Sequence, residues 1–201
     1  MRYLGFDVFD AEPGAVADAT DALNRTLVTV ESAPGVFGVD GPSMTPISTR
    51  AFFWQLMGRL AITACRTFLA ARLGQYAPCW VPSYQSDLEL TLDVASIDTA
   101  IEIRSVGYTI AYATNLARQH VAFFVGGLIV PVKVIGAHDN GDGTETLTLE
   151  SAPGVAIPKG TAASFLLFSR LASDDAEIIY QTPAYAECTL SFVEVPREVP
   201  A

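Results

Sequence analysis

The chain has 201 residues, of which half are hydrophobic and 17% are charged, well below the roughly 25% typical of soluble domains. This length suits one domain or two small ones, and the low charge density predicts that part of the surface contacts other protein. The 22 acidic residues outnumber the 12 basic ones and give a net charge of −10, which disfavours tight binding of nucleic acid or anionic lipid.

Residues 3–9, YLGFDVF, alternate loosely between large apolar and small or polar side chains, which predicts a short strand. Residues 10–24 are rich in Ala and Asp, and we interpret them as an arm that is mobile or held by a partner. Residues 25–39 hold two apolar runs on either side of a Pro-Gly pair, which predicts a β-hairpin. There is no signal-peptide pattern and no apolar stretch long enough to span a bilayer, so we expect a soluble protein made without export.

Residues 49–57, TRAFFWQLM, are aromatic enough for a buried strand. The clearest helix is predicted over residues 59–73, where apolar residues recur at three- and four-residue spacing. Arg72 falls in its last turn, where positive charge complements the helix dipole. Gly74 stands where a left-handed end of the helix is expected.

The sequence after Gly74 is typical of β structure. Gly126 and Gly127 divide two apolar runs as in a hairpin, and the Asn-Gly and Asp-Gly pairs of residues 140–143 mark a turn. The segment 88–94 alternates so that four apolar residues share one face: Leu88, Leu90, Leu92 and Val94. Further strands are predicted over residues 101–106, 164–171, 176–182 and 186–195. We therefore expect a mainly β, α+β fold, a sandwich or barrel with one principal α-helix at about residues 59–73.

The three cysteines, Cys65, Cys79 and Cys188, are odd in number and have no short metal-ligand spacing. We predict that all three are reduced and buried as small apolar residues, which implies assembly under reducing conditions.

Enzymatic chemistry that needs a nucleophile beside a base has little support. The sequence contains two histidines, and neither a Gly-x-Ser-x-Gly elbow nor a His-Glu-x-x-His pattern accompanies His120 or His138. The acids Asp174, Asp175 and Glu177 fall in a predicted exposed turn, so we interpret them as solvated rather than as a catalytic pair. We expect no enzymatic activity and no catalytic residues.

Asp139, Asn140 and Asp142 offer oxygen ligands in a Gly-rich loop. However, Gly141 and Gly143 occupy the third and fifth positions, where an EF-hand calcium loop needs ligands. A tight turn is therefore favoured over a metal site. The VGGLIV run lacks the Lys-Ser or Lys-Thr of a phosphate-binding loop, so we expect neither a metal nor a cofactor.

Aromatic residues gather on either side of the predicted helix. We predict that they form core between a strand and the helix, because such rings usually dominate buried contacts. A carbohydrate-binding platform is the alternative. The residues are Phe52, Phe53, Trp54, Phe68, Tyr76 and Trp80.

The stretch from Arg66 to Leu90 resembles a segment of the distal tail proteins of long-tailed, siphovirus-type bacteriophages. In those proteins a helix with a Phe-x-x-Ala-Arg-x-Gly pattern leads into a Pro-aromatic-Trp-x-Pro-Ser segment and then an Asp-Leu strand. Cys79 stands where an aromatic residue is more usual. The matching residues are Phe68, Ala71, Arg72, Gly74, Pro78, Trp80, Pro82, Ser83, Asp87 and Leu88.

A second block, Ser169 to Val195, resembles the closing hairpin of the same proteins. The segment 120–154 is similar in the order of its elements, so the resemblance covers most of residues 47–196. These motifs are structural. The positions we expect to serve structure or assembly are Phe68, Arg72, Gly74, Trp80, Pro82, Asp87, Glu187 and Phe192.

This resemblance implies a virion structural protein of the tail tip, assembled in the bacterial cytoplasm. It implies a homo-oligomeric ring, commonly of six copies, that joins the tail tube to the hub or baseplate and lets DNA pass. The implied partners are further copies of the chain and the tube, hub or baseplate and tape-measure proteins, with no membrane and no tightly bound nucleic acid. An acidic inner wall would let DNA slide past, because like charges repel.

We expect residues 1–87 and 170–197 to build the ring-forming β-sandwich with the helix, and residues 88–169 to form an inserted small barrel. One continuous domain is the alternative. Two other functions stay open at this stage. The chain could be another tail-tip component, such as a hub adaptor or a tail terminator, or a glycan-binding β-sandwich module. Complete burial of Trp80 would count against the glycan-binding module.

Overall fold

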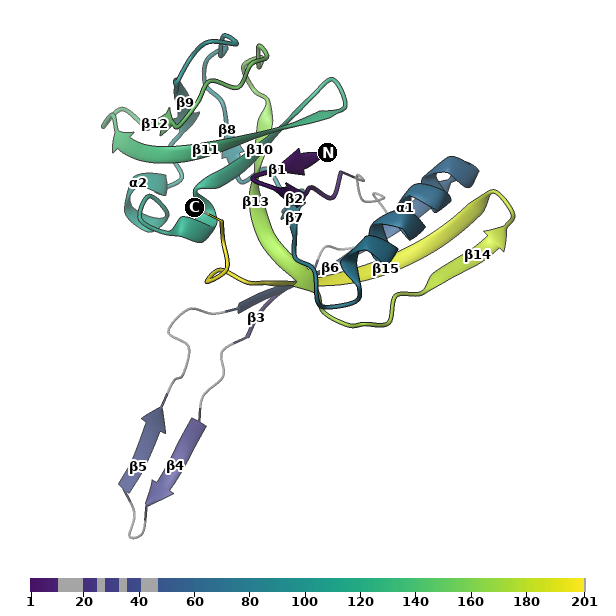
Figure 1. Cartoon of the computed structure of the whole chain (residues 1–201). Helices are drawn as coiled ribbons and strands as arrows, with labels where there is room; N and C mark the ends of the chain where they lie inside the picture. The colour runs from purple at the N-terminus through teal and green to yellow at the C-terminus, as the bar shows by residue number, and fades with distance from the viewer. Residues whose placement is uncertain (11–19, 25–27, 33–35, 41–46, 201) are drawn as a thin grey trace. The chain divides into compact units, whose positions relative to one another are not determined.

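The computed structural model describes residues 1–10, 20–24, 28–32, 36–40 and 47–200. These residues form many antiparallel strands and few helices (Figure 1), which confirms the predicted mainly β, α+β class. Backbone contacts divide them into two compact units, which are described separately. The first unit holds residues 1–10, 78–169 and 196–200, and the second holds 20–24, 28–32, 36–40, 47–77 and 170–195.

The first unit is built around a closed β-barrel. Its strands pair as antiparallel neighbours in the order β13 (Ala162–Leu171), β10 (His120–Val125), β11 (Leu128–Asp139), β12 (Thr144–Leu149) and β9 (Ala100–Arg104). The short β8 (Leu88–Glu89) pairs with β13, and a bridge between Leu90 and Ile103 joins its continuation to β9. The ladder therefore returns to its start, which removes the open edges that an unclosed sheet would leave.

Apolar side chains from all the barrel strands form one buried cluster, which includes Leu88, Leu90, Ile103, Val121, Val132, Leu147 and Phe165. The alternation predicted for residues 88–94 is wrong at Leu92, which is 54% exposed. The reason is that β8 ends at Glu89 and the chain bends before Val94 returns to the core.

The predicted glycine hairpin connects β10 to β11. Gly126 and Gly127 have φ angles of 58° and 78°, in the left-handed region that a tight two-residue hairpin turn requires. The predicted turn at residues 140–143 likewise connects β11 to β12.

The single strand predicted over residues 3–9 is instead a small hairpin. Strand β1 (Arg2–Tyr3) pairs with β2 (Phe6–Asp7), and Leu4 and Gly5 make the turn with φ angles of 47° and 83°. The prediction failed because leucine rarely adopts this backbone conformation. The chain then runs beside β7 (Cys79–Pro82), where the Phe9 N–H donates to the Trp80 carbonyl at 2.8 Å.

The second unit is an antiparallel sheet with one long helix packed on it. Strands β3 (Thr20–Asn24), β6 (Ile47–Met57), β15 (Tyr185–Glu194) and β14 (Ile178–Thr182) pair in that order. Helix α1 (Gly58–Arg72) follows β6 directly and packs on β6 and β15 (Figure 1). The strands and the helix predicted for residues 49–57, 59–73, 176–182 and 186–195 are thus confirmed, with small shifts at their ends.

Strands β4 (Val28–Ser32) and β5 (Val36–Asp40) pair with each other and confirm the hairpin predicted over residues 25–39. Within the described part of the chain they make a separate two-stranded sheet. Residues 20–24, which we assigned to an arm, instead pair with β6 as β3. The rest of that predicted arm, residues 11–19, lies outside the described residues.

Candidate functional site

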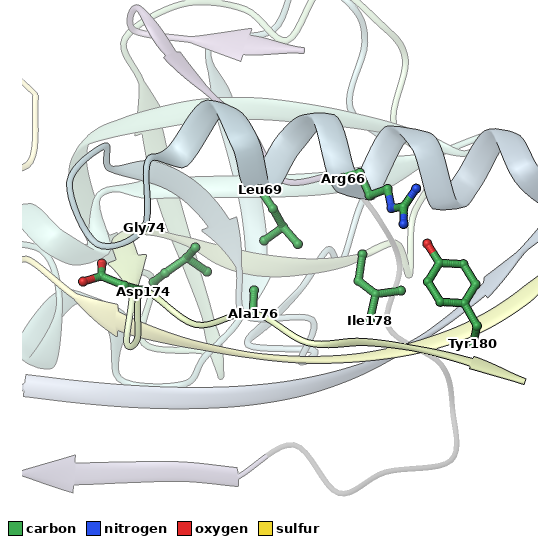
Figure 2. A pocket seen from close by; sticks show the side chains of 8 residues that line it. Arg66, Leu69, Gly74, Asp174, Ala176, Ile178 and Tyr180 are labelled. Carbon is green, nitrogen blue, oxygen red and sulfur yellow. The ribbon is translucent and has the colours of Figure 1, made fainter.

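A groove in the second unit runs between α1 and the segment that leads into β14 (Figure 2), with a volume of about 430 Å³. Leu69 of α1 and Ile178 of β14 both line it. At one end, the guanidinium carbon of Arg66 lies 5.2 Å from the centre of the Tyr180 ring, a cation–π contact. Asp174 lies at the other end (Figure 2), so the groove is apolar in the middle and carries opposite charges at its ends.

Asp174 fixes the point where the chain leaves α1. Its Oδ1 accepts the Gln75 N–H at 2.7 Å, and the Gln75 side-chain amide donates to the Ala172 carbonyl at 2.9 Å. The predicted left-handed helix end is confirmed at Gly74 and already begins at Leu73, with φ angles of 66° and 51°. Asp174 is exposed, as expected for an acid in a turn, but it also accepts this backbone hydrogen bond.

Three of the positions expected to serve structure or assembly pack against other side chains of this unit: Phe68, Arg72 and Phe192. The guanidinium carbon of Arg72 lies 4.9 Å from the centre of the Phe68 ring one turn away, and Arg72 is only 5% exposed. Phe192 is buried and contacts the ring of Trp54 at 6.2 Å between centres.

Glu187 lies on the sheet face turned away from α1. Since Ile178 lines the groove beside α1 and successive side chains of a strand point to opposite faces, Ile179 points the other way. Glu187 is the cross-strand partner of Ile179 and shares its face. A second hollow on this side is lined by Asp175, Glu177, Ile179 and Thr189, together with Asp174 and Ala176.

We call Asp175, Glu177, Ile179, Glu187 and Thr189 the acidic sheet face. The residues that line its hollow include no Lys or Arg. The Tyr185 hydroxyl donates to Glu187 Oε1 at 2.7 Å, which holds that carboxylate in place. The arrangement is a negatively charged surface without a paired cation at the hollow, suited to repelling anions rather than to binding them.

The expected positions Trp80, Pro82 and Asp87 lie in the first unit and hold its strands together. Pro82 pairs with Leu166 at the end of β7. Asp87 Oδ2 accepts the Phe165 N–H at 2.8 Å and also the Ser83 hydroxyl, which ties the loop after β7 to β13. The structure therefore assigns these residues to packing and loop closure.

The core prediction holds for half of the aromatic cluster, namely Phe52, Trp54 and Trp80. Trp80 is completely buried, and Phe52 and Trp54 are 4% and 2% exposed. Phe53 and Phe68 are half-buried, and Tyr76 is 75% exposed. Trp80 belongs to the first unit, where its Nε1–H donates to the Tyr3 carbonyl at 3.0 Å.

His120 is a buried residue beside Trp80, with ring centres 4.6 Å apart. Its Nδ1 lies 3.0 Å from the Tyr3 hydroxyl. Burial and the nearby Lys133 ammonium lower the pKa of His120 to about 4, against a smaller opposing effect of Glu150. The ring is therefore neutral near pH 7. His138 is exposed on β11, and neither histidine lines the groove or the second hollow.

Sequence analysis missed a polar network centred on Glu145 of β12. This side chain is 1% exposed, and its two oxygens accept hydrogen bonds from residues that lead into the short helix α2 (Tyr108–Ala111). Another unpredicted element, the 3₁₀ helix η1 (Leu116–Arg118), follows α2. The donors are the N–H groups of Val106, Gly107, Tyr108 and Thr109 and the hydroxyls of Ser105 and Thr109, at 2.6 to 3.0 Å.

These donors stabilise the ionised form of Glu145. Burial opposes ionisation, but the hydrogen bonds, led by those of Thr109, outweigh it and lower the pKa of Glu145 to about 2. The sequence did carry a signal, since Glu145 alternates with Leu147 and Leu149 and so shares their inward face.

The loop at residues 139–143 is the tight turn we predicted. Asp139 accepts the Gly141 N–H at 2.9 Å, and Asp142 accepts the Thr144 N–H at 3.0 Å. Within the ranges that the structure describes, no group of three or more His, Cys, Asp or Glu side chains is placed to hold a metal ion. A helix with the length and apolarity needed to cross a membrane is likewise not found among those residues.

No family model matches this chain, and no curated protein is significantly similar to it in sequence. Its function is therefore inferred from the residues and geometry described above.

Proposed function

We propose that this chain is a structural subunit of a bacteriophage tail tip, namely a distal tail protein. Six copies form a ring between the tail tube and the hub or baseplate, and DNA passes through it. The resemblance of residues 66–90 and 169–195 to that family supports the assignment. The partners are further copies of the chain and the tube, hub and tape-measure proteins, and assembly takes place in the bacterial cytoplasm before the protein enters the virion.

The structural observation that carries the proposal is the β4–β5 hairpin. Two strands of five residues pair with each other and, in the described part of the chain, form their own sheet. A two-stranded hairpin is marginally stable in water, so it gains from a surface that packs on it or pairs with its edges. A ring provides such a surface at every position, because each copy presents the same site to the next.

Exposed apolar side chains at the start of α1 also support contacts with other protein. Met57 and Leu60 are 72% and 85% exposed. Large apolar residues that gather on a surface commonly mark interaction sites. Together with the low charge of the chain, they favour a subunit of an assembly.

The acidic sheet face is our candidate for the wall of the DNA channel. Asp175, Glu177 and Glu187 carry negative charge on the side of the sheet away from α1. Like charges would repel the DNA backbone and keep the genome from sticking as it moves. A tight DNA-binding role would need the opposite charge.

Complete burial of Trp80 removes the main support for a glycan-binding module, because this ring is not accessible to a sugar. A hub adaptor or a tail terminator would share the supporting observations with a distal tail protein. Immunogold labelling of particles distinguishes them, since a distal tail protein is labelled at the tip end of the tube and a terminator at the capsid end.

The experiment that tests the hairpin is its replacement. Residues 25–40 are exchanged for a Gly-Ser linker, and the mass of the assembly is measured by native mass spectrometry. The matched control replaces residues 140–143, the turn of the first unit, with Gly and Ser. We expect the first variant to lose the ring and the control to keep it, while both still unfold cooperatively. A ring of unchanged mass without the hairpin would contradict the role given to it, and a wild-type monomer would contradict the ring itself.

A further inference from the structure

Cys65 and Cys188 are far apart in the sequence but meet in the second unit. Cys65 lies on the buried side of α1, one turn before Leu69. Leu69 lines the groove together with Ile178 (Figure 2). Ile178 is the cross-strand partner of Cys188, so these two side chains share the sheet face on which α1 packs. The register thus places Cys188 beneath the part of α1 that carries Cys65.

The two thiols lie close enough for each to shift the pKa of the other through a side-chain hydrogen bond. They are 8% and 2% exposed and are not joined by a disulfide. That hydrogen bond lowers the pKa of Cys65 against the opposing effect of burial, and it raises the pKa of Cys188, as burial also does. One sulfur of the pair therefore ionises more readily, while the other retains its proton. This division is typical of an attacking and a resolving cysteine.

We propose that Cys65 and Cys188 form an oxidisable pair whose disulfide locks α1 onto β15. The oxidant is a peroxide. The Cys65 thiolate attacks one oxygen of hydrogen peroxide, the O–O bond breaks, and the departing hydroxide takes up a proton to become water. Cys65 is left as a sulfenic acid.

In the second step the Cys188 sulfur attacks the sulfur of Cys65. The S–O bond breaks, the S–S bond forms, and hydroxide leaves with the Cys188 proton as a second water. The two thiols have together lost two electrons, which the peroxide has gained. The inference needs only the fold of the second unit and does not rest on the proposed ring.

Cys79 provides an internal control. It is also buried, but it lies in β7 of the first unit, where its register partner is Ser169. A disulfide between Cys65 and Cys188 closes a long loop of chain and so restricts the unfolded state. We therefore expect the melting temperature of the oxidised protein to rise by roughly 5 °C or more, reversibly with dithiothreitol.

The test treats the folded full-length chain with a small excess of hydrogen peroxide. Intact mass, a non-reducing peptide map and the melting temperature are then measured for the wild type and for the variants Cys65→Ser, Cys188→Ser and Cys79→Ser. Circular dichroism before treatment confirms that each variant is folded. Where a serine variant does not fold, the alanine variant replaces it.

We expect wild type and Cys79→Ser to lose two hydrogens, to give one cross-linked peptide pair and to melt at a higher temperature. Cys188→Ser should instead stop at a sulfenic acid on Cys65 that dimedone traps, with no rise in melting temperature. Reaction of the thiols only after unfolding in urea, or a cross-link that includes Cys79, would overturn the proposal.

Discussion

Gly74 and Asp174 lie against each other where α1 ends. A Cβ atom at position 74 would overlap the Oδ1 atom of Asp174, the same oxygen that accepts the Gln75 N–H at 2.7 Å. The φ angle of Gly74 is also 66°, which side chains disfavour. Glycine is therefore required there both by its backbone conformation and by a close neighbour.

Gly74→Ala should destabilise the chain by about 3 kcal/mol, of which the left-handed backbone accounts for about 1–2 kcal/mol. In an Asp174→Ala background the overlap with the carboxylate is gone and the contact with the Cα atom of residue 174, at 3.2 Å, remains, so the cost should fall towards the backbone part. The measurement is a double-mutant cycle in urea unfolding. Gly141→Ala is the matched control, since its φ is 77° but nothing lies within 4 Å of the added Cβ. Equal costs at positions 74 and 141, with no coupling to Asp174, would refute the close-contact argument.

Glu145→Gln should cost about 3 kcal/mol of the free energy of unfolding, because a neutral amide weakens several charge-assisted hydrogen bonds and sets an NH₂ group against a backbone donor. The readout is the urea midpoint together with loss of hydrogen-exchange protection at residues 106–109. The exposed pair of Glu89 with Arg104, at 3.5 Å, provides the control. Glu89→Gln should change stability by less than about 1 kcal/mol. Similar effects of the two substitutions would mean that the Glu145 network does not order α2.

Protonation of the buried His120 should be visible in the pH dependence of the free energy of unfolding. The folded pKa of His120, about 4, lies below its ordinary value of 6.5, so the unfolded chain binds the proton more readily. The stabilisation is present above pH 6.5 and is lost as the pH falls through the window from 6.5 to 4. His120→Asn keeps a polar atom near the Tyr3 hydroxyl. In this variant the free energy of unfolding should change less with pH across this window. An unchanged slope in the variant would assign the effect to other groups.

At lower pH a second loss of stability should follow from protonation of Glu145. Its folded pKa of about 2 lies below the ordinary 4.5, so its stabilisation is present above pH 4.5 and is lost as the pH falls from 4.5 towards 2. Urea midpoints measured between pH 2 and 5 test this directly. Glu145→Gln should remove this lower slope and leave the one due to His120, whereas the same slope in wild type and variant would contradict the assignment.

Trp80→Ala should destabilise the first unit by about 3–5 kcal/mol, because it leaves a cavity beside His120 and removes the hydrogen bond to the Tyr3 carbonyl. Tyr76→Ala is the matched control, since that ring is 75% exposed, and its effect should stay within about 0.5 kcal/mol. Unfolding of the wild type and of each variant, followed by fluorescence and circular dichroism, measures both changes in the free energy of unfolding. A tolerated Trp80→Ala would reopen the possibility that this ring serves binding.

Sequence patterns were sufficient for elements with strong local signals. The apolar spacing over residues 59–73 predicted α1, and the pairs at 126–127 and 140–143 predicted two turns, because helix periodicity and turn chemistry are encoded in a few neighbouring residues. The alternation that failed at Leu92 shows the limit of this method. Where a strand ends depends on its neighbours, here β13 and β9, which are distant in the sequence.

The site features that sequence analysis missed all depend on contacts between distant residues. The barrel closes through a bridge between Leu90 and Ile103. Glu145 accepts hydrogen bonds from residues 106–109, and Cys65 lies beside Cys188. Local sequence patterns indicate none of these contacts. Trp80 was expected to be core, but its partners Tyr3 and His120 come from elements that no local pattern connects to it.

Cryo-electron microscopy of the purified wild-type chain tests the central proposal most directly. The proposed function predicts closed rings of six copies with the acidic sheet face, marked by Glu187, towards the central channel. A population made up entirely of single, unassociated chains at micromolar concentration, and absent from purified phage particles, would contradict it.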